Sequence, residues 1–289
     1  AVAGGPGRGG VGGNGARGGN GGGGGGGGWF GGAGGSGGGN PGNLYGAGGG
    51  GGSSYAGADA TDVALLQGVN QGNGHATVSF RYDTTTTLTA DTQSPLFGHP
   101  VTLTTTVGAD NAAAATPTGT VTFSDGATAL ATVPLSDGQA TFTTAAFQPG
   151  AHAITAAYSG DAGSTPSATA DPTGLTVGFS EPCFTAAHHG PLTVGTGRSL
   201  CLAVGSTQDG PVTVRPGGAL AVLGAQVHGP LSADGVAAFT ACGSTFDGPV
   251  SVNGAVGSVL IGPGSGTPGD CAGNTFHGPL TLRGHVTSW

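Results

Sequence analysis

A four-residue phrase, His or Asp followed by Gly, Pro and then Leu or Val, recurs five times between residues 189 and 280 of this chain. Its prolines stand at positions 191, 211, 230, 249 and 279, so successive copies are 20, 19, 19 and 30 residues apart. The last interval fits one repeat plus an insertion of about eleven residues. A fixed period of this length is typical of solenoids, in which each coil contacts only its neighbours. The repeats predict a solenoid over residues 178–289.

Each copy continues after Gly-Pro with an apolar, a small polar and an apolar residue, as in Leu192-Thr193-Val194. A second apolar stretch follows in the earlier copies. Two or three short strands in each coil of about 19 residues fit a parallel β-helix, with apolar residues inward and Thr or Ser outward. The second stretches run from Leu200 to Val204, Leu220 to Leu223, Ala237 to Phe239 and Val259 to Ile261.

The residue before each Gly-Pro should form a column, because equivalent residues of neighbouring coils lie about 4.8 Å apart. The column reads His189, Asp209, His228, Asp247 and His277. We interpret it as structural, since both residue types tolerate turns and the alternation avoids stacking like charges. The functional alternative is a metal-binding or protonation-sensitive ladder, because both side chains are metal ligands. A straight column offers only adjacent pairs, whereas a metal needs several ligands around one point.

A second column carries hydroxyl groups. Its members are Thr193, Thr213, Ser232, Ser251 and Thr281. A flat hydroxyl ladder can order water or contact sugars, so ice binding and glycan binding are possible functions. Solvent-facing strand positions commonly carry the same residues, and a single column that mixes Ser with Thr favours this simpler interpretation.

All four cysteines lie after residue 180. Cys242 and Cys271 precede the repeat phrase by five and six residues in successive coils, so we predict that they form a disulfide. Cys183 lies six residues before the first phrase, at His189, which leaves Cys201 as its expected partner one coil later. Four cysteines allow three connectivities, and a redox or metal thiol site is the functional alternative. The even count and the absence of Cys-x-x-Cys favour structural disulfides in an oxidising compartment.

The composition argues against several functions. The 289 residues include 67 Gly, and only 7% are charged, against about a quarter in an ordinary soluble domain. A formal charge of −8 and six scattered Arg argue against nucleic-acid binding. No apolar run is long enough to span a membrane. The chain has no Lys and one Glu, which excludes a Walker A lysine, a Schiff base or a pair of catalytic glutamates. We therefore expect no enzyme activity, cofactor or metal.

Two further segments precede the repeats, and they differ in composition. Residues 1–82 form a predicted glycine-rich domain that ends in β-strands, among them the alternating stretch from Ala76 to Tyr82. This segment is either a disordered linker or a bundle of polyglycine helices. Residues 83–177 are rich in Thr, Ala and Val, with seven strand-length runs separated by turns such as Asp137-Gly138. Seven short strands predict a β-sandwich. The runs are Thr84 to Thr89, Pro100 to Val107, Gly119 to Phe123, Ala129 to Leu135, Gln139 to Thr144, His152 to Tyr158 and Leu175 to Val177.

Alternation predicts which side chains of the sandwich point inward. They are Leu88, Val101, Leu103, Val121, Phe123, Leu135, Phe142, Ile154 and Tyr158. His75, His99 and His152 stand alone in the sequence, and we assign them no function.

Three resemblances to known families accompany these patterns. The phrases Gly98-His99-Pro100-Val101-Thr102-Leu103, Pro117-Thr118-Gly119-Thr120-Val121-Thr122-Phe123 and Tyr158-Ser159-Gly160-Asp161 resemble the bacterial Ig-like domain of group 3, which implies a spacer or adhesive module. The run from Gly21 to Tyr55, closed by Gly72 to Phe80, resembles the glycine-rich domain of anaplastic lymphoma kinase and its bacterial relatives. The Gly-Pro repeats resemble secreted actinobacterial β-solenoid repeats.

The sequence thus predicts an all-β, non-enzymatic protein made of a glycine-rich domain, an Ig-like sandwich and a short parallel β-solenoid. We expect it to be secreted or displayed on a bacterial cell surface, with a structural or adhesive role. Its possible partners are an extracellular polysaccharide or a cell-surface protein. The alternative is a carbohydrate-binding or polysaccharide-processing β-helix, although Arg198, Arg215 and Arg283 are the only basic residues after position 178.

Overall fold

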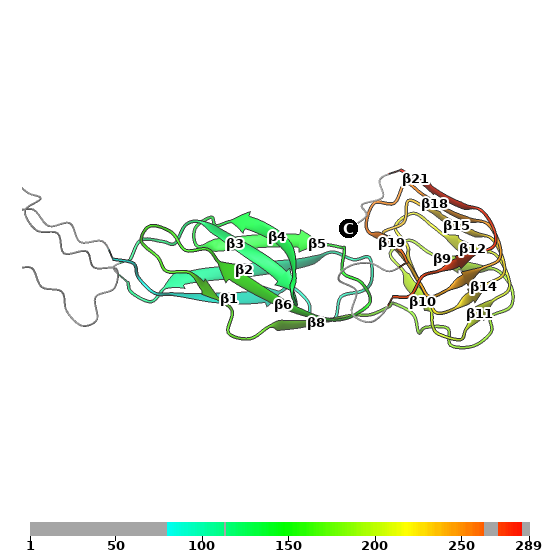
Figure 1. The fold of residues 1–289 in the computed structure, drawn as a ribbon, viewed down its shortest axis with the longest axis horizontal. Coiled ribbons are helices and arrows are strands. Elements are labelled where there is room, and N and C mark those ends of the chain that lie inside the picture. Colours follow the sequence, from blue (N-terminus) through cyan, green and yellow to red (C-terminus); the bar gives the residue numbers. More distant parts are fainter. Residues whose placement is uncertain (1–79, 113, 263–270, 285–289) are drawn as a thin grey trace, which may run out of the picture. The chain divides into compact units, whose positions relative to one another are not determined.

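The computed structural model describes residues 80–112, 114–262 and 271–284, and all regular structure within these ranges is β-strand (Figure 1). The chain divides into two compact units, residues 1–78 and 79–289. The predicted glycine-rich domain lies outside the described residues, apart from its last three positions. The described part of the chain contains no helix that could cross a membrane.

Residues 84–177 form a β-sandwich of two antiparallel sheets (Figure 1). One sheet has the order β1-β2-β5. The other has the order β4-β3-β6-β7, and β8 also pairs with β6. The strands are β1 (Thr84–Ala90), β2 (Val101–Ala109), β3 (Thr120–Asp125), β4 (Thr128–Pro134), β5 (Gln139–Thr144), β6 (Gly150–Tyr158), β7 (Ser167–Ala168) and β8 (Thr173–Val177).

Alternation along these strands builds the core of the sandwich. In β2, Val101, Leu103 and Val107 are buried, while Thr106 faces solvent. All seven predicted strands are present with ends within two residues, and only the two-residue β7 was not predicted. The predicted inward residues are confirmed. Val101, Leu103, Val121, Phe123, Ile154 and Tyr158 are buried, and Leu88, Leu135 and Phe142 pack against them half-buried.

The repeats wind into a solenoid whose strands form three parallel sheets (Figure 1). The first sheet consists of β9 (Leu192–Val194), β12 (Val212–Val214), β15 (Leu231–Asp234), β18 (Val250–Asn253) and β21 (Leu280–Arg283). The second consists of β10 (Ser199–Leu202), β13 (Ala219–Leu223), β16 (Ala238–Cys242) and β19 (Val259–Ile261). The third consists of β11 (Thr207–Gln208), β14 (Gln226–Val227), β17 (Thr245–Phe246) and β20 (Thr275–Phe276). Five Gly-Pro phrases thus correspond to four complete coils and one further strand, β21.

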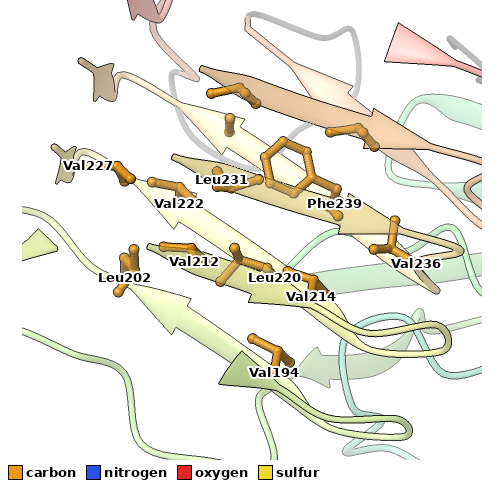
Figure 2. Packing of buried hydrophobic residues seen from close by; sticks show 14 of the residues in the cluster. Val194, Leu202, Val212, Val214, Leu220, Val222, Val227, Leu231, Val236 and Phe239 are labelled. Carbon is orange, nitrogen blue, oxygen red and sulfur yellow. The ribbon is translucent and has the colours of Figure 1, made fainter. Parts of the chain in front are cut away.

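Each coil pairs with the next one repeat later, so side chains of one kind stack through the domain. Val212 of β12 pairs with Leu192 of β9 on one side and with Leu231 of β15 on the other. The inward columns are aliphatic or aromatic (Figure 2). Phe246 and Phe276 stack with ring centroids 4.9 Å apart. The predicted pattern of apolar residues inward and hydroxyls outward is confirmed in the first sheet.

Glycine shapes the coils at two kinds of position. At the corner after β15, Gly235 has a φ of 61°, which disfavours residues with a Cβ. Within the repeat phrase, a Cβ on Gly248 would lie 2.6 Å from the carbonyl oxygen of Gly229 in the preceding coil. A Cβ on Gly278 would meet Gly248 at the same distance. The glycine of the phrase therefore permits the close approach of successive coils.

The outer face of the second solenoid sheet departs from the prediction that outward positions are polar. Ala219, Ala221 and Ala238 point out of the solenoid core, yet each is at most 1% exposed. They belong to one buried apolar cluster with Phe97 of the sandwich. The following Gly98 lies so close that a Cβ there would be 2.8 Å from that of Ala219. These positions are small and apolar because the sandwich covers them.

The core of the last coil is less covered than that of the coil before it. Leu280 and Leu282 of β21 are 38% and 42% exposed. Val250 and Val252, their partners in β18, are each 1% exposed. The insertion before the last phrase lies in the sequence between β19 and β20.

Candidate functional site

The predicted His and Asp column exists as a ladder of imidazole–carboxylate contacts at the corner that follows the third solenoid sheet. Asp209 contacts Nδ1 of His189 in the coil before it and Nδ1 of His228 in the coil after it, the latter at 2.8 Å. Asp247 lies 3.6 Å from Nε2 of His228 and 2.7 Å from Nδ1 of His277. Each carboxylate thus stands between two imidazoles, as the alternation predicted.

The side chains of the ladder are exposed to solvent. The contacts with histidine nevertheless change the pKa of Asp209. The hydrogen bond from His228, followed by that from His189, holds the pKa of this carboxyl below its ordinary value. Among the described residues, no three His, Cys, Asp or Glu side chains lie close enough together to hold a metal ion. At this corner an imidazole and a carboxylate stand next to each other at every step from coil to coil.

The predicted hydroxyl column is also present, on the outer face of the first solenoid sheet. Thr213 pairs with Thr193 and Ser232, and Ser251 pairs with Ser232 and Thr281. Thr193 and Thr213 are exposed, and the other three are half-exposed. One continuous column of hydroxyl groups therefore crosses five strands.

A third column lies beside the hydroxyls, and the sequence analysis missed it. Its members follow the proline of the phrase by four residues: Arg215, Asp234, Asn253 and Arg283. Asn253 donates from Nδ2 to Asp234 at 2.8 Å and to Ser251 at 3.0 Å. Alignment of the repeats at this position would have found the column, since polar residues recur there after the first coil.

The two disulfides join residues one coil apart. The bonds are Cys183–Cys201 and Cys242–Cys271, with Cα atoms 4.7 and 5.0 Å apart. These are the two predicted pairs among the three connectivities. Cys271 lies in the insertion between β19 and β20, so its bond ties that insertion to the end of β16.

The sandwich holds two polar clusters that the sequence did not indicate. Asp161 accepts hydrogen bonds from the backbone N–H and the hydroxyl of Thr118, both at 2.8 Å. These two bonds, the backbone one first, hold the pKa of Asp161 well below its usual range. They join the turn after β6 to the segment before β3. Thr118 and Asp161 lie within two of the phrases that carried the family resemblance.

His152, to which no function was assigned, has partners on both ring nitrogens. Nδ1 bonds Asp125 at 2.6 Å, and Nε2 bonds the carbonyl of Gln148 at 2.7 Å. Both ring nitrogens therefore have a hydrogen-bond partner, one a carboxylate and the other a backbone carbonyl. Asp125 also accepts the N–H of Ala153 at 3.1 Å. No local motif could reveal this pair, because 27 residues separate its members.

Comparison with known proteins identifies one part of the chain. Residues 88–178 match the family model of the bacterial Ig-like domain (group 3), which coincides with the observed sandwich. No curated protein and no solved structure matches the chain. The chain therefore contains an Ig-like sandwich, similar to the bacterial Ig-like domain (group 3), followed by a β-solenoid.

Proposed function

We propose that this protein is a non-enzymatic structural module of the bacterial cell exterior. In this proposal the first solenoid sheet presents a contact surface for an extracellular polysaccharide or a cell-surface protein. The Ig-like family match supports a structural or surface role. Two disulfides in a chain without Lys are compatible with an oxidising, extracellular environment.

The proposal rests on one observation: the outer faces of the first and second solenoid sheets differ in polarity and in burial. The outer face of the second sheet is small, apolar and buried against the sandwich. The outer face of the first sheet bears a hydroxyl column, an amide and charged groups, and exposed prolines such as Pro211 and Pro230. A rigid, repetitive polar surface suits an extended, repetitive ligand such as a polysaccharide chain, through many weak hydrogen bonds.

Binding of the full chain to an array of bacterial polysaccharides tests this role. Thr213→Lys places a long charged side chain in the hydroxyl column and should reduce binding. Gln226→Lys, on the exposed face of the third sheet, makes the same charge change elsewhere and should leave binding intact. Equal loss in both variants, or no binding by the native chain, would contradict the proposed surface.

The alternative is a β-helix that processes polysaccharides. The same array distinguishes it, because turnover releases new reducing ends and binding alone does not. Binding without such release supports the structural role.

A further inference from the structure

A cavity of about 170 Å³ lies where the β3–β4 hairpin, the loop before β6 and the start of β19 meet. Its walls are mainly apolar, with Leu130, Phe142 and Phe147 on one side and Val259 and Leu260 on the other. A cavity of about 150 Å³ is known to hold a benzene molecule. The volume therefore suits one six-membered ring.

The cavity wall also carries the Asp125–His152 pair. The carboxylate of Asp125 accepts one bond from His152 and one from Ala153, and its side chain is 17% exposed. A carboxylate has about four acceptor positions, so Asp125 can accept a further hydrogen bond. Both ring nitrogens of His152 already have partners, so they are not free for a ligand. In this pair, the carboxylate of Asp125 is therefore the group that can accept a hydrogen bond from an uncharged ligand.

The hydroxyl of Ser258 is a second, independent observation that points to a ligand in this cavity. This residue lines the cavity, is 5% exposed, and its hydroxyl has no hydrogen-bond partner among the described residues. A buried polar group left without a partner costs about 1–3 kcal/mol, so such groups in native proteins need an explanation. A hydroxyl can both donate and accept, which matches a ligand group with the same ability.

We propose that this cavity binds a phenol ring, either a free monocyclic phenol or the tyrosine side chain of a partner protein. The ring fills the apolar volume, and its hydroxyl matches the acceptor of Asp125 and the unpaired hydroxyl of Ser258. The exposed residues Thr128 and Ala129 border the cavity and give access from solvent. The inference does not depend on the polysaccharide surface, because it uses a different part of the molecule.

Titration of the ¹⁵N-labelled full chain with p-cresol, toluene and N-acetyltyrosinamide tests the proposal. We expect saturable shifts in the amide signals of Leu130, Phe147 and Leu260 with p-cresol. Toluene should bind about tenfold more weakly, because it lacks the hydrogen-bonding group. Binding of N-acetyltyrosinamide as well indicates a tyrosine side chain, and binding of p-cresol alone indicates a free phenol. Absence of saturable shifts with either phenol overturns the proposal.

Two variants locate the site. Ala129→Phe should fill the cavity mouth and abolish p-cresol binding, whereas Ala168→Phe, at an exposed site on β7 outside the cavity, should not. Ser258→Ala should weaken p-cresol binding about tenfold and leave toluene binding unchanged. Unchanged p-cresol affinity in Ala129→Phe would place the ligand elsewhere and refute the assignment.

Discussion

The glycine of the repeat phrase determines how closely the solenoid coils stack. Its backbone lies against the carbonyl group of the preceding coil, so even one methyl group there has no room. The sequence predicted the stacked columns at the repeat phrase, because the spacing of the repeats determines which residues of successive coils are neighbours. It did not indicate why glycine precedes each proline, since that reason lies in the contact between coils.

Replacement of this glycine should therefore destabilise the solenoid. We expect Gly248→Ala to lower the free energy of unfolding by about 1–3 kcal/mol, because the new Cβ meets the backbone of Gly229. Urea denaturation measures the change. Gly273→Ala is the matched control, as nothing lies within 4 Å of a Cβ at that exposed position. Similar losses in both variants would contradict the packing argument.

Asp161 should make stability depend on pH in acid. Its pKa in the folded protein is lowered, so its contribution to stability is complete above the unfolded pKa of about 3.9 and is lost as pH falls through the lower folded value. Asp161→Asn should therefore flatten the fall in stability below about pH 4. Urea denaturation at a series of pH values measures this slope. The exposed Asp171→Asn is the control, and an unchanged slope in Asp161→Asn would refute the assigned cause.

At the scale of elements, strands with alternating or recurrent patterns were predicted well. β5 has the predicted bounds, and the first and second solenoid sheets follow the two predicted apolar stretches. The two-residue strands β7 and β11 carry too little pattern to be distinguished from turns. The cysteines were paired correctly because a disulfide between neighbouring coils requires nearly equal positions in the repeat.

Loss of the second disulfide should weaken the last coils. Cys242 and Cys271 are 29 residues apart, and a loop of this length corresponds to about 3.6 kcal/mol in the chain-entropy model. We expect the Cys242→Ser, Cys271→Ser double variant to lose stability of that order in urea denaturation. The corresponding variant at Cys183 and Cys201, which closes a loop of 18 residues, should lose slightly less. Unchanged stability in both variants would show that the bonds do not constrain the chain.

At the scale of the molecule, the structure unites two segments that the sequence analysis separated at residues 177 and 178. The Ig-like sandwich and the solenoid share a buried cluster, and Gln148 contacts Thr240 at 2.5 Å. Alanine at positions 219, 221 and 238 gave no sign of this contact, because small residues are common on many surfaces. The shared core explains why those outward positions are apolar, and it joins the sandwich to the solenoid.

Hydrogen exchange of the full chain tests this shared core most directly. In native protein and in Gly248→Ala, exchange of peptides from β2 of the sandwich is compared with that of peptides from β13 of the solenoid. If the two share one cooperative core, the substitution in the solenoid lowers the protection of β2 and β13 by the same free energy. Loss of protection confined to the solenoid peptides would show that the modules unfold independently, and would contradict the account.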